Sequence, residues 1–287
     1  MCTWPAPAKL NLFLHVVGRR ADGYHELQTV FQFLDQADQL SFRVRTDGQI
    51  LRTSGPAAIP ATMDLCVRAA QALQKAAQIR LGVEIDIIKR IPWGAGLGGG
   101  SSDAATTLVA LNRLWHCGCT VDELAQLGLS LGADVPVFVR GQAAWGEGVG
   151  ERLTPLQLPQ PWYLVITPPC QVSTAEIFGD PELTRDTPKI TISDFLAGQG
   201  HNDCLPVVRR HYPPVAQALD WLTAQDAQAR LTGTGASVFA AFADQARAQE
   251  LLMKLPMGFS GLVTQGRNRS ALLDALAGWD NGERGEF

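Results

Sequence analysis

The sequence has no excess of positive charge and no long apolar run. It holds 24 Lys and Arg against 28 Asp and Glu, a formal net charge of −4. Proteins that bind nucleic acid or anionic membranes in general usually carry an excess of basic residues, so neither partner is expected. No stretch approaches the roughly 18–20 apolar residues of a membrane span. Residues 1–18 do not resemble a signal peptide, because Lys9 and Asn11 interrupt their apolar stretch. A cytoplasmic protein is expected.

Metal-binding and disulfide motifs are also missing. The six cysteines include no CxxC pair, and the five histidines form no HExxH motif or other ligand cluster. Cys117 and Cys119 stand too close together for a zinc knuckle, and no second pair of ligand residues lies nearby in the sequence. We therefore expect six reduced thiols and no protein-bound structural metal.

Strand and helix patterns alternate along the 287 residues. Alternating or continuous apolar residues predict strands at 10–17, 27–34, 40–45, 83–88, 163–167, 237–242 and 261–266. Apolar residues at helical spacing predict helices at 65–77, at 122–131, at 215–224, at 244–255 and after residue 100. Residues 48–60 are rich in Gly, Pro and small residues and are expected to be a loop. The two blocks predict an α+β fold of two domains that share a cleft, 1–153 (ATP-binding) and 154–287.

The most informative stretch runs from Pro92 to Ser102, where five glycines occur in seven residues between a strand and a helix. Glycines let the backbone approach a ligand closely, and Ser101, Ser102 and Asp103 are good residues to begin a helix. Free N–H groups at a helix start bind anions, so this loop is predicted to hold the phosphates of ATP. A branched side chain at Gly98 is expected to block the phosphates and leave the fold intact. The ATP-binding residues predicted here are Pro92, Trp93, Gly94, Ala95, Gly96, Leu97, Gly98, Gly99, Gly100, Ser101 and Ser102.

Three other interpretations of this loop were weighed. A tight turn without a ligand would need only one or two glycines. A dinucleotide-binding fingerprint would sit at the first strand and carry an acidic residue about 20 positions later, and neither condition is met. A Walker A loop would have a lysine after the glycines, and none follows. The cationic and acid/base groups of a phosphoryl-transfer site must then come from elsewhere in the chain.

Three motifs together resemble the superfamily of galactokinase, homoserine kinase, mevalonate kinase and phosphomevalonate kinase. They are Pro7–Leu12 (PAKLNL), Pro92–Ser102 and Leu231–Ser237 (LTGTGAS). With Arg20–His25 (RADGYH) and Leu131–Pro136 (LGADVP), the chain resembles, over its whole length, the members that phosphorylate 4-diphosphocytidyl-2-C-methyl-D-erythritol on its 2-hydroxyl. That resemblance implies ATP with Mg²⁺ as co-substrate, an acceptor with a cytidine diphosphate group, and a place in the non-mevalonate route to isoprenoid precursors.

The resemblance also implies roles for individual residues. Asp134 matches the general base and Lys9 its cationic partner, while Asn11, Tyr24, His25, Thr174 and Phe178 match the cytidine-side pocket. Without the resemblance, Lys9 would be interpreted as a solvated charge, Asp134 and His25 as turn residues and Phe178 as core.

One position departs from the family pattern. The family usually has Asn-Leu near the adenine site, and this chain has Asp64-Leu65. The sequence therefore leaves open which residues contact the adenine there.

The sequence also leaves two other functions open: a kinase of the same superfamily that acts on another alcohol, or a catalytically silent nucleotide-binding regulator. The presence of both Lys9 and Asp134 argues against silence. A monomer and a homodimer are equally compatible with the sequence.

Overall fold

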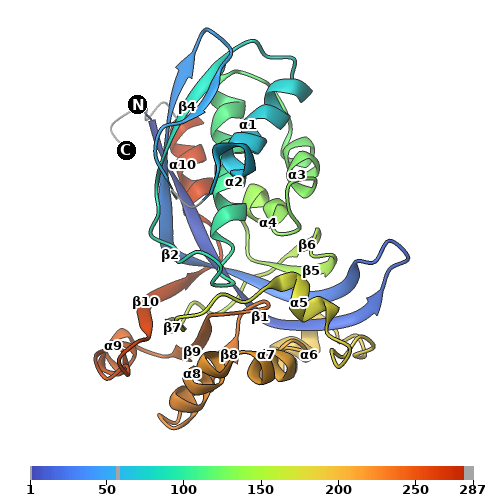
Figure 1. Cartoon of the computed structure of the whole chain (residues 1–287), viewed down its shortest axis with the longest axis vertical. Coiled ribbons are helices and arrows are strands. Elements are labelled where there is room, and N and C mark those ends of the chain that lie inside the picture. The colour runs from blue at the N-terminus through green and yellow to red at the C-terminus, as the bar shows by residue number, and fades with distance from the viewer. Residues whose placement is uncertain (1, 56–58, 281–287) are drawn as a thin grey trace.

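A mixed sheet runs through both halves of the molecule (Figure 1). The computed structural model describes residues 2–55 and 59–280. Its strands are β1 (Cys2–Arg19), β2 (His25–Arg45), β3 (Ile50–Arg52), β4 (Gly82–Ile88), β5 (Ala144–Gly148), β6 (Arg152–Pro155), β7 (Trp162–Thr167), β8 (Arg230–Leu231), β9 (Val238–Phe242) and β10 (Ser260–Arg267). The order is β3-β4-β2-β10-β7-β9-β8, and β1 and β5 also pair with β2. Only β3 and β4 run parallel among the strand pairs of the described residues.

The helices cover this sheet in two groups (Figure 1). The upper group in the figure is α1 (Leu65–Ala76), α2 (Gly99–Leu114), α3 (Val121–Leu129), α4 (Val135–Arg140) and α10 (Ala271–Asp280); the lower is α5 (Thr174–Gly179), α6 (Ile192–Leu196), α7 (Leu205–His211), α8 (Pro213–Thr223) and α9 (Gln245–Met253). The 3₁₀ turn η1 spans Ala61–Met63. Across residues 2–55 and 59–280, no helix has both the length and the apolar character that crossing a bilayer requires.

The mixed α+β architecture is confirmed, and two of its details correct the sequence predictions. The strands expected at 27–34 and 40–45 are one strand, β2. Asp38 lies in its middle, and its carboxylate accepts hydrogen bonds from the backbone N–H groups of Arg90 and Ile91, which satisfies the buried charge without breaking the strand. Residues 50–52, expected to be loop, form β3 and pair with β4.

β1 connects the two halves because its alternate residues enter three different core clusters. Trp4 belongs to the upper core, Leu10 to a central cluster and Val16 to the lower core. The last helix also connects the two halves: α10 follows the lower block in sequence but packs in the upper one, where Leu272 is buried. We keep the division near residue 153 as a proposal, with α10 assigned to the first block by its packing.

A buried histidine lies where β1 meets the lower block. His15 is only 2% exposed, and its Nε2 lies 3.2 Å from Nδ1 of His201. His201 in turn contacts Asp203 through Nε2, at 2.7 Å. Burial lowers the pKa of His15, His201 lowers it further, and Asp203 opposes both.

This arrangement predicts a loss of stability in mild acid. The pKa of His15 is near 6.5 in the unfolded chain and lower in the folded protein. Below pH 6.5 the unfolded chain therefore binds more protons, and the free energy of unfolding falls until the pH passes the folded-state pKa. Urea unfolding between pH 7.5 and 5 is expected to give a shallower pH dependence for His15→Gln than for the parent. The exposed His116, replaced by Asn, is the control and should keep the parent slope; a His15→Gln slope equal to the parent's would contradict this account.

Candidate active site

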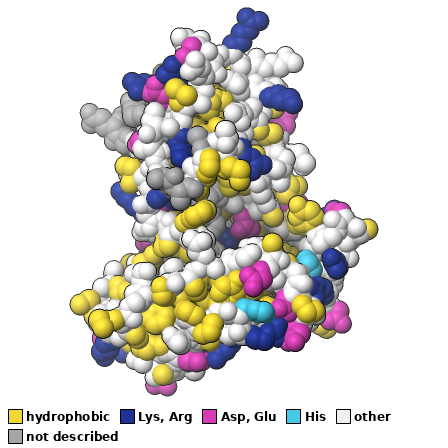
Figure 2. All heavy atoms as spheres, in the orientation of Figure 1, with side chains coloured by type: hydrophobic (Ala, Val, Ile, Leu, Met, Phe, Trp, Pro, Cys, Tyr) yellow, Lys and Arg dark blue, Asp and Glu magenta, His cyan; other side chains and the backbone are white. Residues whose placement is uncertain are grey.

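A cleft of about 400 Å³ separates the upper and lower parts of the molecule. Figure 2 shows it as a hollow between the two masses. Its lining comes from β1 and β2, the loop 92–98 with the start of α2, the residue before α4, the loop 233–235 and α5. Segments from distant parts of the sequence therefore meet around one space.

The glycine-rich loop is held in the cleft by its alternate residues. Ala95 and Leu97 are buried in the central core cluster, while Gly94, Gly96 and Gly98 have positive φ angles of 68°, 74° and 74°. A Cβ on Gly96 would lie 2.7 Å from each of two carbonyl oxygens in the loop 232–235. Only glycine tolerates both the left-handed backbone and this close approach. The loop thus exposes its backbone to the cleft, as a phosphate cradle requires.

α2 begins earlier than the sequence suggested. Its N-cap is Gly98 and its first residue is Gly99, so Ser101, Ser102 and Asp103 lie inside the helix and cap nothing. The loop glycines supply the left-handed turn into the helix, which leaves no position for a side-chain cap. Residues 92–101 line the cleft, whereas the Ser102 side chain is fully buried behind it and has no hydrogen-bond partner among the described residues.

Lys9 and Asp134 form an ion pair at the floor of the cleft. Lys9 Nζ lies 3.2 Å from Asp134 Oδ2, with the two side chains 3% and 33% exposed. Lys9 is therefore not a solvated surface charge. Asp134 occupies the N-cap position of α4, yet its carboxylate makes no capping hydrogen bond, so it is available to a ligand in the cleft.

The Lys9 ammonium is held by several neighbours at once. It donates to Asn11 Oδ1 and, at 3.3 Å, to the Gly96 carbonyl of the glycine loop. Asn11 Nδ2 donates to Thr29 Oγ1 at 2.9 Å, which fixes the amide. The Phe31 ring lies 5.7 Å from Nζ, where a cation–π contact is favourable. Asn11, expected on the cytidine side, is thus placed beside Lys9. Thr29 and Phe31 were not found from the sequence, where nothing distinguishes them from other residues of a buried strand.

Of the remaining predicted residues, Thr174 and Phe178 line the cleft and Tyr24 and His25 do not. Thr174 and Phe178 of α5 line it, and Thr174 Oγ1 lies 3.0 Å from Thr234 Oγ1 in the loop beside the glycines. The His25 and Phe178 rings stack with centroids 5.0 Å apart at 25°. Tyr24, 63% exposed at the β1–β2 turn, and His25 do not themselves line the cleft.

A second, more apolar cavity of about 630 Å³ shares Leu65, Lys89, Trp93 and Gly100 with the cleft. Asp64 lines it, but its carboxylate is already engaged. It caps α1 by accepting from the Cys66 N–H at 2.8 Å and pairs with Arg52 Nη1 at 2.7 Å. The residue that departs from the family pattern therefore has a structural role.

Lys89 lies between two carboxylates at the edge of the same cavity. It bonds to Asp38 Oδ2 and, at 2.7 Å, to Asp103 Oδ2. Burial lowers the pKa of Lys89, but the two carboxylates outweigh it and the pKa lies above the usual value. Burial raises the pKa of Asp103 to about 7, against the opposing effect of Lys89. This cluster gives an otherwise apolar cavity a polar wall.

Comparison with known proteins identifies the family of this chain. The family model for the GHMP kinases N-terminal domain matches residues 64–142, and that for the GHMP kinases C-terminal domain matches 191–257. A 4-diphosphocytidyl-2-C-methyl-D-erythritol kinase from Nitrosococcus oceani is 59% identical over 276 residues, 96% of this chain and 98% of the relative. One from Shewanella loihica is 54% identical over 94% of this chain and 95% of the relative. The chain belongs to this kinase family.

Solved structures extend the comparison. A crystal structure of a 4-(cytidine 5'-diphospho)-2C-methyl-D-erythritol kinase superposes with a TM-score of 0.80 at 33% identity, covering 92% of this chain and 99% of that one. A mevalonate kinase matches with a TM-score of 0.68 at 16% identity and covers 94% of this chain and 100% of the other, which indicates a shared fold. The expected kinase superfamily fold is confirmed.

The structure changes how the glycine loop of this kinase is best tested. A Cβ on Gly98 would lie 2.7 Å from the buried Phe138 ring. The expectation that a branched residue at Gly98 leaves the fold intact is therefore wrong, because the core must shift to admit it.

Gly100 provides a cleaner substitution. Outside its own helix, a Cβ there would meet only Leu65 Cδ1 among the described residues, at 3.6 Å, and Gly100 lies where the cleft joins the apolar cavity. Gly100→Ala is expected to keep or raise the melting temperature, because alanine favours helix. It should weaken ATP binding by about tenfold, the usual effect of one misplaced methyl group. Calorimetric titration with ATP measures this, and an unchanged affinity in the folded variant would remove Gly100 from the nucleotide site.

Proposed function

We propose that this kinase transfers the γ-phosphate of ATP to the 2-hydroxyl of 4-diphosphocytidyl-2-C-methyl-D-erythritol, in the non-mevalonate route to isoprenoid precursors. The observation that carries the proposal is the Lys9–Asp134 pair, 3.2 Å apart, facing the glycine loop across one cleft. Such a pair supplies a base and a fixed positive charge, the two groups that a phosphate loop without a lysine lacks.

In the proposed reaction, Asp134 accepts the proton of the acceptor hydroxyl. The oxygen forms a bond to the γ-phosphorus, and the bond from that phosphorus to the β–γ bridging oxygen breaks to release ADP. Lys9 stabilises the charge that spreads over the transferred group, and Asn11 holds Lys9 in place. Because its ammonium is already bonded to neighbours, little reorganisation accompanies the reaction.

ATP would lie with its phosphates along the glycine loop and its base in the adjoining apolar cavity. The free N–H groups at the start of α2 suit the triphosphate, and the polar wall made by Lys89 and Asp103 suits the edge of a base. Mg²⁺ would enter with the triphosphate, whose oxygens it prefers as ligands. Ser101, which lines the cleft, offers such an ion a hydroxyl.

The acceptor would bind at the α5 end, with its cytosine near Phe178 and Tyr24 and its diphosphate toward Thr174. An ADP-release assay tests the assignment by comparing the cytidine diphosphate compound with free methylerythritol, mevalonate, homoserine and galactose. We expect the first to be the preferred acceptor. A simple alcohol that reacts faster would refute the acceptor while leaving the kinase assignment in place.

A further inference from the structure

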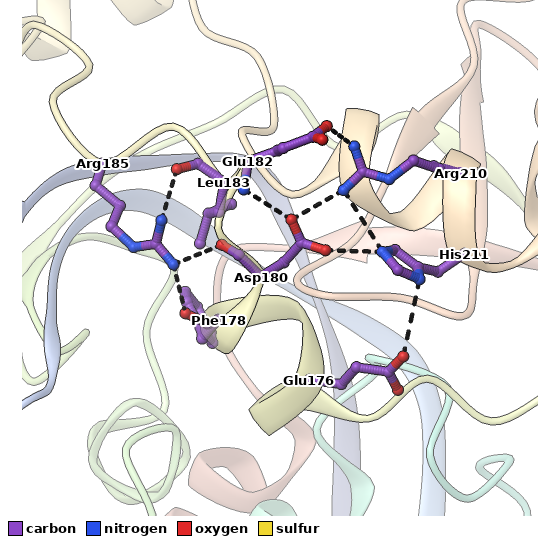
Figure 3. Close-up of polar contacts among 8 residues, drawn as sticks. All are labelled: Glu176, Phe178, Asp180, Glu182, Leu183, Arg185, Arg210 and His211. Carbon is purple, nitrogen blue, oxygen red and sulfur yellow. Dashed lines mark hydrogen bonds and ion pairs between the residues drawn. The ribbon is translucent and has the colours of Figure 1, made fainter.

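Arg185 lies in the segment between α5 and α6, and the described residues place no carboxylate within ion-pair distance of it. Its guanidinium instead donates to neutral acceptors (Figure 3). Nη1 donates to the Leu183 carbonyl at 2.9 Å, and Nη2 donates to the carbonyls of Phe178 and Asp180 at 3.0 and 2.7 Å. Nε donates to Nε2 of His25 at 3.1 Å. A planar group with this many directed bonds has one orientation.

The contact between Arg185 Nε and His25 Nε2 determines which nitrogen of the His25 ring carries the proton. Arginine can only donate, so Nε2 of His25 must be the accepting nitrogen, and the ring proton lies on Nδ1. Burial lowers the pKa of His25, and the charges of Arg185 and Arg19 lower it further. His25 is therefore a neutral ring of one tautomer.

The same guanidinium holds both members of an aromatic pair. His25 begins β2 after the turn of the β1–β2 hairpin, and Phe178 is in α5, more than 150 residues later in the sequence. Their rings stack at 5.0 Å, and Phe178 lines the cleft. Arg185 bonds the ring of the first and the backbone of the second, so it links the hairpin to α5.

The loop after α5 has a second anchor that does not involve Arg185. The Asp180 carboxylate pairs with Arg210 Nη2 at 2.9 Å and with His211 Nε2 at 2.7 Å (Figure 3). Glu182 N–H also donates to Asp180 Oδ1, at 2.8 Å. Loss of Arg185 would leave these contacts in place. The loop should stay folded while His25 loses its partner.

We propose that Arg185 is the positioning residue of the acceptor pocket: it holds the neutral His25 ring and the Phe178 backbone in the arrangement that receives the pyrimidine of the acceptor. This rests on the proposed function for the identity of the acceptor. Arg185 acts through His25 and Phe178 and touches no reacting atom. Its effect is therefore on acceptor binding and not on the phosphoryl-transfer step.

Steady-state kinetics of Arg185→Ala test the proposal. We expect the KM for the cytidine diphosphate acceptor to rise by about tenfold or more, with a smaller change in kcat and a KM for ATP within about twofold of the parent. Arg185→Lys should behave similarly, because one ammonium cannot serve His25 and the three carbonyls together. Arg210→Ala is the matched control, since it removes the contacts of Arg210 with Asp180 and Glu182 but none of the contacts of Arg185, and its acceptor KM should stay within about threefold.

A double-mutant cycle with His25→Ala separates positioning from a general loss of structure. If Arg185 acts largely through His25, the two effects on acceptor KM will be less than additive. An acceptor KM that Arg185→Ala leaves unchanged, or an equal rise in both KM values, would overturn the proposal. Arg185→Gln, which keeps amide donors, serves if the alanine variant fails to fold.

¹⁵N NMR of the imidazole nitrogens gives a readout that needs no substrate. In the parent, Nε2 of His25 should carry no proton at neutral pH; in Arg185→Ala the pKa of His25 should rise and this tautomer should no longer dominate. A parent His25 protonated on Nε2 would refute the Arg185 contact directly. If the parent protein does not phosphorylate the cytidine diphosphate compound, the proposed function fails. The role of Arg185 is then still decided by the NMR result and by the effect of Arg185→Ala on the KM for whichever acceptor the enzyme does phosphorylate.

Discussion

Asp134→Asn is expected to lower kcat by about 10²–10⁴-fold, the range that one general base contributes, and to leave ATP affinity nearly unchanged. The amide keeps the size of the side chain but cannot take the proton of the acceptor hydroxyl. Because the Asp134 carboxylate caps no backbone group of α4, the helix should be unaffected. ADP release measures kcat, and titration calorimetry measures ATP binding.

Asp122→Asn is the control for this substitution. The Asp122 side chain is 81% exposed on the neighbouring α3 and pairs only with Arg140 among the described residues, so its loss should not change turnover. Lys9→Ala should lose activity as severely as Asp134→Asn. Lys9→Ala should also lower stability, because the buried Asn11 amide is left with an unpaired oxygen. Near-normal turnover of Asp134→Asn would remove Asp134 from the mechanism.

An acceptor without its cytidine diphosphate group is expected to lose more than about 100-fold in kcat/KM, because binding energy far from the reacting hydroxyl positions it for transfer. Stacking of a base on an aromatic ring is worth about 1–3 kcal/mol, or one to two decades in affinity. The diphosphate contacts add to that. Kinetics with free methylerythritol beside the full acceptor measure the loss.

Phe178→Ala makes the matching change on the protein. It should raise the acceptor KM by about 10–100-fold and affect ATP little, and it should have much less effect on free methylerythritol, which has no base to stack. Phe195, which stacks on Phe13 in a separate core cluster, gives a control substitution to alanine away from the cleft. Equal losses with both acceptors would mean that Phe178 supports the fold and does not contact the base.

The glycine loop and the ion pair were predictable because their residue types are unusual for their positions. Five glycines between a strand and a helix have few structural explanations. Burial of Lys9 did not follow from its local sequence, since it depends on the Gly96 carbonyl and on Asp134, which come from two distant segments. The α2 start was misplaced because Ser and Asp are good caps in general, whereas here the left-handed Gly98 makes the turn.

Other features depend on contacts that no local pattern encodes. Asp38 lies between the two strands predicted at 27–34 and 40–45, and it is tolerated within β2 because Lys89 and the backbone N–H groups of Arg90 and Ile91 reach it from the end of β4. Arg185 follows a Pro-Glu-Leu-Thr stretch typical of an exposed loop, and its importance comes from the His25 ring more than 150 residues earlier. Such roles arise from tertiary structure and are visible only there.

The position of α10 has a consequence for the order in which the protein can fold as it is synthesised. Leu272 is part of the upper core, and Trp279 stacks at a tilt on Trp4, with ring centroids 5.5 Å apart. The upper block therefore lacks one wall of its core until the lower block and then α10 have been made. During that interval β1 and α2 expose the apolar surface that α10 later covers. A nascent chain stalled before residue 271 should bind chaperones that recognise apolar segments, and one released with α10 should not.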